Sequence, residues 1–320
     1  MANIVTVAKT EDGTRIMRWF LRRYPSMPQR EFYKLCRGGQ IRVNSSRVRG
    51  NEILRAGDVV RVPPTLATYE KAPQKSESGD NFSMEDLEVL RRCIIHNDDD
   101  VVVFDKPAGL AVQGGTGIRK SVDKMAAALF PYDKISLVHR LDRETSGVLV
   151  VAKSQRAAQS LAAQFQTKTA HKEYLALLRG SVTPPHGTID NYMVKGMVLD
   201  SPRRINNGTG PRPQRAITDY DVLCAASGMT WIHFAPKTGR THQLRLHSAQ
   251  SLHAPIVGDT LYGGDVADDA IKSVVRTNNL FLFAFKLTFQ HPVTGRMMTL
   301  RGQLPEFMRP VVKLLELPLP

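Results

Sequence analysis

The sequence has little cysteine and no long apolar run, and both absences exclude classes of protein. Its three cysteines, Cys36, Cys93 and Cys224, are widely separated and form no CxxC pair, so neither a disulfide framework nor a cysteine zinc site is expected. No apolar run approaches the roughly 18 residues of a membrane-spanning helix, and the first residues lack the apolar stretch of a signal peptide. We therefore expect a cytoplasmic protein with no membrane partner.

Acidic residues are also in deficit, with 30 Asp and Glu against 44 Lys and Arg, which leaves a net charge of +14. An excess of this size favours a polyanionic partner, and nucleic acid is the first to consider once membranes are set aside. The excess is uneven, because residues 14–64 contain twelve basic residues and only three acidic ones. This amino-terminal segment is therefore the first candidate for a nucleic-acid contact.

Length and pattern indicate one small and one large domain. In residues 1–66, apolar residues at helical spacing predict two helices, the second capped by Ser26 with Pro28 in its first turn, and two short strands follow. Residues 67–85 have almost no apolar content, which is typical of a linker. Residues 86–320 mix helices and strands without a regular βαβ alternation, which favours an α+β fold with a mixed or antiparallel sheet.

Within the large domain the apolar pattern predicts individual elements. The expected strands are VVVFDKP, VLVVAKS, YLALLRG, MTWIHFAP and FAFKLTFQHP, and the helix is AAQSLAAQFQ. The excursion from Arg203 to Gln214 is expected to be a basic loop.

Several catalytic motifs are nearly present and fail on a residue. GGTGIRKS has Arg119 where a phosphate-binding P-loop needs Gly before its Lys, so no nucleotide cofactor is expected. His242 and His247 are five residues apart with no third ligand nearby, so hydrogen-bonded histidines are favoured over a metal site. TSG lacks the GxSxG elbow of serine hydrolases, and Gly147 stands where a kinase loop has Asn.

The stretch HRLDRETSG places Asp142 between Arg140 and Arg143, ahead of a strand that would hold it at the rim of a sheet. About a hundred residues later, PKTGRTHQLRLH offers Arg240 and Arg245 as a second wall of the same cleft. A fixed guanidinium keeps a neighbouring carboxylate charged, which suits a nucleophile better than a proton donor. On the residues alone, a solvated structural turn remains the alternative.

These motifs together resemble a known family. VVVFDKPAGLAV, LVHRLDRETSGVLVVAK, KEYLAL, and PKTGRTHQLRLH with PIVGDTLYG are similar to the RluA-type pseudouridine synthases, from about Glu88 to the carboxyl terminus. CRGGQIRVN, GLAVQGGTG and NNLFLFAFKLTFQHPVTG favour the RluC-like branch, which modifies large-subunit (23S) ribosomal RNA in bacteria. Residues 1–66 resemble an S4 domain, a small RNA-binding fold. The resemblance implies a pseudouridine synthase fold, with a largely antiparallel sheet flanked by helices and loops.

The resemblance also implies roles for individual residues. Asp142 would be the essential carboxylate that attacks the target uridine, Arg245 would pair with it, and Tyr174 would lie against the uracil and assist proton removal. Arg140 would enter the base stack when the uridine is extruded. His139, Thr145 and Gly147 would shape the loop, and Lys106 would close the floor of the site. Arg240 and His242 complete the expected substrate contacts. The residues expected to bind RNA are Arg15, Arg18, Lys34, Arg37, Arg42, Arg47 and Arg49.

Two alternatives to a ribosomal RNA synthase remain at this stage. One is a tRNA pseudouridine synthase, and the other is a non-catalytic RNA-binding factor in ribosome assembly. The expected partner is ribosomal RNA or a pre-ribosomal particle, with a monomeric protein, no metal and no cofactor. The chain departs from relatives at Phe283, where many have His, and at His253, where many have Gly. We expect both departures to affect how the neighbouring strand and loop meet the RNA.

Overall fold

Two units, each with its own hydrophobic core, make up the part of the chain that the structure describes. The structure is a computed structural model, and it describes residues 3–8, 11–24, 27–69, 82–115, 117–194, 196–201, 212–263 and 279–319. The first unit comprises Met1–Asn81 with Phe130–Asp133, and the second comprises Phe82–Leu129 with Lys134–Pro320. Ser26, residues 70–81 of the expected linker and most of the expected basic loop lie outside the described residues.

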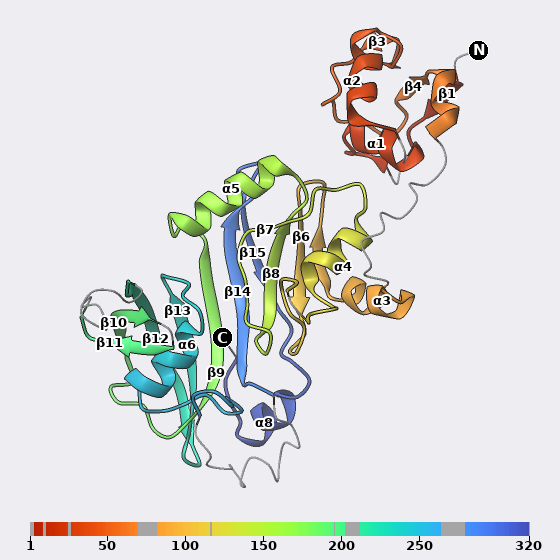
Figure 1. Cartoon of the computed structure of the whole chain (residues 1–320). Helices are drawn as coiled ribbons and strands as arrows, with labels where there is room; N and C mark the ends of the chain where they lie inside the picture. The colour runs from red at the N-terminus through yellow and green to blue at the C-terminus, as the bar shows by residue number, and fades with distance from the viewer. Residues whose placement is uncertain are drawn as a thin grey trace. The chain divides into compact units, whose positions relative to one another are not determined.

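The first unit packs two helices against a small antiparallel sheet (Figure 1). Its helices pack Trp19, Phe20 and Phe32 into one core. Pro28 occupies the N-cap of the second helix and not its first turn, a shift of one position from the prediction. The elements are β1 (Asn3–Thr6), α1 (Ile16–Arg23), α2 (Gln29–Arg37), β2 (Arg42–Val43), β3 (Ser46–Arg47), β4 (Val59–Val62) and a 3-10 helix, η2 (Pro64–Tyr69), with the strands in the order β1-β4-β2-β3.

The second unit is built on one large sheet with helices and loops around it. Its helices are α3 (Met84–Arg92), α4 (Val122–Leu129), α5 (Gln155–Gln166), α6 (Gln243–Leu246), a π-helical turn η3 (His247–Ser251) and α8 (Arg309–Leu314). Its strands are β5 (Ile94–Asn97), β6 (Val101–Lys106), β7 (Ser136–Leu137), β8 (Ser146–Ala152), β9 (His171–Arg179), β10 (His186–Val194), β11 (Met197–Leu199), β12 (Gln214–Ala226), β13 (Met229–Pro236), β14 (Leu282–Gln290) and β15 (Met297–Arg301).

The sheet of the second unit is mixed and largely antiparallel. Its order is β11-β10-β12-β13-β9-β14-β8-β6-β5, with β15 added to β14 and β7 added to β8. Among the described strands of this sheet, β8 and β14 pair in parallel, and every other pair is antiparallel. Consecutive valines in β6 and β8 are buried on both faces, as expected for central strands. The predicted α+β class and the predicted strands and helix are thus confirmed.

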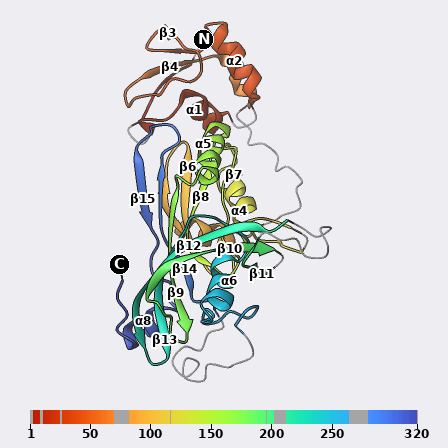
Figure 2. The same ribbon diagram turned by 90° about the vertical axis from the view of Figure 1, so that its left-hand side faces the viewer.

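Helix α5 shows how the sequence fixes the covering layer. Ser154 caps it by accepting a hydrogen bond from the Ala157 N–H at 3.1 Å, and Ala157 and Leu161 are its buried side chains. The helix packs against β7, β8 and β14. Figure 2 shows α5 and α6 on the same side of the sheet, and both helices contribute residues to the pocket described below. Among the described helices, none is both long and apolar enough to span a lipid bilayer.

Candidate active site

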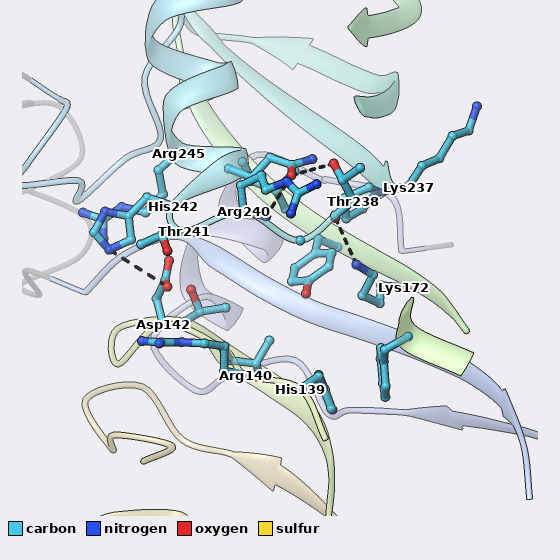
Figure 3. Close-up of a pocket in the computed structure, with 18 of the residues that line it drawn as sticks. His139, Arg140, Asp142, Lys172, Lys237, Thr238, Arg240, Thr241, His242 and Arg245 are labelled. Carbon is cyan, nitrogen blue, oxygen red and sulfur yellow. Dashed lines mark hydrogen bonds and ion pairs between the residues drawn. The ribbon is translucent and has the colours of Figure 1, made fainter. Parts of the chain in front are cut away.

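A cavity of about 480 Å³ lies between the loop before β8 and the segment from Pro236 to Arg245 (Figure 3). Strand β9 contributes Tyr174 to it, and the end of α5 contributes Phe165. Among the described residues that line it, Asp142 is the one acidic side chain. Six basic side chains also line it: Arg140, Lys168, Lys172, Lys237, Arg240 and Arg245. The pocket therefore suits an anionic ligand and offers that ligand a single carboxylate.

Asp142 lies on a loop whose conformation is fixed by several hydrogen bonds. Only 20% of its side chain is exposed, although it faces the pocket. Arg143, its neighbour, does not line the pocket and donates from Nε to the Gly109 carbonyl at 3.1 Å. The Asp142 carbonyl accepts the Thr145 N–H at 3.1 Å, which closes the turn into β8. Of the two flanking arginines, only Arg140 lines the pocket, where its side chain is exposed.

Lys106 differs from its predicted position. Its side chain is 1% exposed and is absent from the pocket lining, so it makes no direct contact with a ligand there. Its Nζ donates to the carbonyls of Pro107, Leu110 and Arg143 at 2.9, 2.9 and 3.1 Å. Burial lowers the pKa of this ammonium to about 7, and the charges of Glu144 and Asp142 oppose the shift. Lys106 therefore fastens the Asp142 loop and does not form the floor of the pocket.

His139 also acts on the loop. Its Nε2 accepts the Val150 N–H at 3.0 Å, and its ring stacks on Phe165 with centroids 4.4 Å apart. Burial lowers the pKa of His139 to about 3, and the positive charge of Lys172 adds to the shift. The imidazole is therefore neutral near neutral pH and serves as a hydrogen-bond acceptor for β8.

Gly147 is required where β8 meets β14. Its φ is +113°, and a Cβ at this position would overlap the carbonyl oxygen and backbone of Ala284 on the neighbouring strand. Any other residue would push β8 and β14 apart directly after the Asp142 loop. The conformation explains the glycine that ends HRLDRETSG.

Arg245 lies in the pocket but pairs with a different carboxylate from the predicted one. Its Nε and Nη2 donate to Asp259 at 2.9 and 2.6 Å, and the two side chains are 5% and 0% exposed. Asp142 is close enough to act on the Arg245 charge through space but is not its ion-pair partner. The predicted direct pairing is therefore wrong, because the edge of the guanidinium formed by Nε and Nη2 binds Asp259, from PIVGDTLYG, and not Asp142.

Among the described residues, His242 is the basic residue within ion-pair distance of Asp142. Its Nε2 lies 4.0 Å from Asp142 Oδ1 (Figure 3). Its Nδ1 lies 2.9 Å from the Tyr262 hydroxyl. Asp259 also accepts the backbone N–H groups of Leu261 and Tyr262 at 2.9 and 3.1 Å. Asp259 and Tyr262 were missed by the sequence reasoning, although both stand in the quoted motif.

Gln243 fixes the conformation of the pocket wall formed by the segment from Pro236 to Arg245. Its Oε1 accepts the Thr238 hydroxyl at 2.7 Å and the Arg240 N–H at 3.0 Å. Its amide nitrogen donates to the Ile217 carbonyl at 3.0 Å and to Thr218 Oγ1 at 2.9 Å. This buried side chain thus ties the turn Thr238–Arg240 to β12, which explains the Gln of the motif.

Tyr174 lies in the pocket as predicted, but its chemistry is restricted. Burial, and then the negative charge of Asp142, raise the pKa of its phenol well above the ordinary value. The hydroxyl therefore keeps its proton near neutral pH, which suits packing against a base and hydrogen-bond donation. A role as an ionised base does not fit this setting.

Lys172 is a basic residue of the pocket lining that the sequence reasoning missed. Its Nζ donates to the Thr238 carbonyl at 3.0 Å, and Figure 3 shows it on the far side of the pocket from Asp142. Burial, and then the charge of Arg240, lower its pKa to about 8. Arg240 is exposed and donates from Nε to the Arg215 carbonyl at 3.1 Å. The signal was in KEYLAL, where only the tyrosine had been given a role.

His247 is a buried structural histidine. Its Nδ1 lies 2.9 Å from Thr218 Oγ1 and its Nε2 lies 3.0 Å from Asn191 Oδ1, so both ring nitrogens are occupied. Within the described ranges, no group of three or more His, Cys, Asp or Glu side chains is arranged to hold a metal. The geometry agrees with the preference for hydrogen-bonded histidines over a His242–His247 metal site.

The burial of His247 predicts a pH dependence of stability. Burial lowers its pKa from 6.5 to about 4, so between these values the unfolded chain binds a proton that the native chain does not. The free energy of unfolding should therefore fall as the pH drops through this window, by on the order of 2–3 kcal/mol from this group. Urea unfolding at intervals across the window measures the loss.

A His247→Gln variant tests the assignment. It should be less stable than the parent at neutral pH but should lose less stability on acidification. His139 continues to contribute down to a pH of about 3 in both proteins. Profiles that run parallel for parent and variant would contradict the prediction.

The predicted RNA-binding arginines of the first unit fall into two groups. Arg18 forms an ion pair with Asp133 at 2.7 Å, and Arg42 donates to the carbonyls of Gly39 and Ser45, both at 3.1 Å. Arg15 is half-buried. The exposed members lie on α2 and on the hairpin and turn that follow it: Lys34, Arg37, Arg47 and Arg49.

The two departures from the family pattern have structural explanations. Phe283 is 1% exposed and packs edge-on to Phe285 in the core. Its expected effect on how the strand meets the RNA stays a prediction. His253 has φ +52°, in the left-handed region where glycine carries no steric cost. A glycine at this position would adopt the observed backbone conformation without that cost.

Comparison with known proteins follows the same motifs. The family described as RNA pseudouridylate synthase matches residues 100–250. Ribosomal large subunit pseudouridine synthase C of Haemophilus influenzae is 32% identical over 311 residues, covering 97% of this chain and 94% of that protein. Its namesakes in Vibrio vulnificus and Escherichia coli K12 are 36% and 33% identical, over 97% and 96% of this chain and 95% and 94% of theirs.

Solved structures agree with the architecture. Human RNA Pseudouridylate Synthase Domain Containing 4 superposes with a TM-score of 0.62 and 28% identity, over 73% of this chain and 97% of that one. Human RNA Pseudouridylate Synthase Domain Containing 1 gives a TM-score of 0.50 and 27% identity, over 72% and 87% of the two chains.

Proposed function

Since the chain belongs to the RNA pseudouridylate synthase family of isomerases and has the pseudouridine synthase fold, we propose that it converts uridines of large-subunit ribosomal RNA to pseudouridine at the Asp142 pocket. The observation that carries this proposal is a single carboxylate in a pocket lined by six basic side chains. Such a pocket attracts the RNA backbone and directs one nucleophile at the base it admits.

The chemistry required is an exchange of glycosidic bonds. The bond from N1 of uracil to the ribose breaks, a bond from C5 to the same ribose carbon forms, C5 loses a proton and N1 gains one. Asp142 attacks either the ribose or the pyrimidine ring and leaves again, so no electrons are gained or lost. The isomerisation itself needs no metal, nucleotide or redox partner.

The uridine has to leave its stack to reach Asp142, at a cost of a few kcal/mol. Arg140 is suited to fill the gap, because its exposed guanidinium borders the pocket beside the Asp142 loop and can stack and hydrogen-bond at once. The phenol of Tyr174 packs against the extruded ring. Lys172 and Arg240 lie across the pocket from Asp142, where they neutralise phosphates next to the target.

Ribosomal RNA is favoured over tRNA because the curated relatives that match nearly the whole chain are named for the large ribosomal subunit. The match includes the first unit, which we propose is an S4-like RNA-binding domain. We further propose that the protein acts in the cytoplasm, as a monomer, on free or pre-ribosomal RNA.

Pseudouridine mapping of all cellular RNA with and without this protein tests the proposal. Loss of one or more sites in large-subunit RNA on deletion is expected, with return of the same sites on re-expression. Loss of sites only in tRNA would move the substrate to the tRNA alternative. No lost site in any RNA would leave the non-catalytic RNA-binding factor.

Neutralising the exposed basic group of the first unit should weaken RNA capture more than turnover. The variant carries Lys34→Gln, Arg37→Gln, Arg47→Gln and Arg49→Gln. If all four contact phosphates, the slope of log affinity against log salt should lose about three units. Filter binding to in vitro transcribed large-subunit RNA at several salt concentrations measures the slope. Turnover at saturating RNA should stay within about threefold of the parent value, and an equal loss of turnover would place these residues in the catalytic step.

A further inference from the structure

Arg245 acts on the Asp142 carboxylate through space, while its Nε and Nη2 bind Asp259. Among the described residues, the basic group within ion-pair distance of Asp142 Oδ1 is the His242 imidazole, with Nε2 at 4.0 Å. An imidazole can offer a carboxylate a proton donor only if that proton is on the nitrogen that faces it. The tautomer of His242 therefore decides whether Asp142 has a donor.

The other ring nitrogen has a fixed partner. His242 Nδ1 lies 2.9 Å from the Tyr262 hydroxyl, and the two rings meet edge to face with centroids 5.7 Å apart. Burial raises the pKa of the Tyr262 phenol, so its proton is available for donation. A donor on the Nδ1 side and an acceptor, Asp142, on the Nε2 side both favour the ring with its proton on Nε2.

The chain holds this arrangement against its local preferences. His242 has φ +55°, a left-handed conformation that costs a non-glycine residue of order 1–3 kcal/mol and persists where the surroundings impose it. Tyr262 is placed by Asp259, which accepts its backbone N–H at 3.1 Å and that of Leu261 at 2.9 Å. The Arg245 guanidinium lies 5.4 Å from the centre of the Tyr262 ring. One buried carboxylate thus orders both the arginine and the tyrosine behind His242.

We propose that Tyr262 is a positioning residue that fixes the tautomer of His242, so that the Nε2–H of the imidazole faces the Asp142 carboxylate and holds it toward the pocket. The inference rests on the proposed function, in which Asp142 is the nucleophile. It gives His242 a part beside Arg245, whose charge reaches Asp142 through space.

The tautomer can be read directly, without any activity. Long-range proton–nitrogen NMR spectra of the full chain labelled with ¹⁵N-histidine distinguish the two neutral tautomers at about pH 8, where an ordinary imidazole is neutral. The His242 signals are assigned as those missing from His242→Gln. The parent should show the proton on Nε2, and Tyr262→Phe should shift signal toward the Nδ1 tautomer. A parent with its proton on Nδ1 overturns the proposal.

Side-chain amides test the same point through catalysis. In His242→Gln the amide nitrogen reaches the position of Nε2, whereas in His242→Asn it reaches only that of Nδ1. The Gln variant should keep kcat within about tenfold of the parent, and the Asn variant should lose about a hundredfold, with KM for RNA changed by less than about threefold in both. Equal activity of the two variants overturns the proposal.

A double variant separates positioning from a merely structural effect. Tyr262→Phe should lower kcat by about tenfold in the parent but leave His242→Gln unchanged, because an amide has no tautomer to set. Tyr220→Phe removes a buried tyrosine hydroxyl that contacts the Pro184 carbonyl outside the pocket, and it is the matched control. An equal loss in both backgrounds overturns the proposal. If the parent itself converts no uridine in any RNA, the proposed function fails, and the NMR result still decides the tautomer.

Discussion

Asp142→Asn should abolish pseudouridine formation while leaving RNA binding within a few fold of the parent. The amide keeps the size of the side chain and its place on the loop, but it cannot form the covalent bond to uridine that the isomerisation requires. Loss of a nucleophile commonly lowers kcat by more than about 10⁴-fold. The pocket keeps its six basic side chains, so the contacts that attract RNA remain. Pseudouridine is measured by carbodiimide adducts on in vitro transcribed large-subunit RNA, and affinity by filter binding.

Glu144→Gln is the matched control for this prediction. Glu144 is two residues away in the same loop, pairs with Arg143 at 3.4 Å and does not line the pocket. Its neutralisation should change kcat by less than about threefold, since an exposed ion pair contributes little. If Asp142→Asn turned over at a rate near that of Glu144→Gln, the assignment of the nucleophile would be wrong.

Arg245→Met should destabilise the fold by about 3–5 kcal/mol and lower activity with it. The change leaves the fully buried Asp259 carboxylate with its two backbone donors but without its cation, and an uncompensated buried charge is costly. Chemical denaturation of parent and variant measures the loss of stability. The effect on kcat follows because Asp259 also places the loop behind His242.

A double-variant cycle tells whether the pairing is the cause. Arg245→Met combined with Asp259→Leu removes both charges, so the double variant should be more stable than Arg245→Met alone, although less active than the parent. Additive losses from the two changes would mean that the guanidinium stabilises the fold through other contacts, and the account of the pair would be wrong.

The elements of the large sheet could be predicted because their signals are local. Runs of buried valine in β6 and β8 and the Ser154 cap of α5 are readable from neighbouring residues alone. The gathering of Asp142, Tyr174 and Arg245 around one pocket followed from the family resemblance, and the structure places all three in its lining.

The pairing of charges could not be predicted, because it depends on distances that the sequence does not contain. Arg245 has two carboxylates within its electrostatic reach, and only the folded chain shows that its Nε and Nη2 donate to Asp259. Lys106 is similar, since a lysine in a motif suggests a ligand contact. Three backbone carbonyls that converge on its Nζ give it an internal role. His242 gained its importance from Tyr262, twenty residues further along the chain.

The tethering of the Asp142 loop has a consequence for the thermodynamics of catalysis. Lys106 donates a hydrogen bond to the Arg143 carbonyl of the loop, and His139 accepts one from the Val150 N–H of β8. Gly147, directly after the loop, packs against the backbone of Ala284. The conformational entropy of Asp142, the proposed nucleophile, is therefore lost when the chain folds and not when RNA binds. The free energy gained by binding RNA can therefore offset the cost of unstacking the uridine, because none of it is needed to order Asp142.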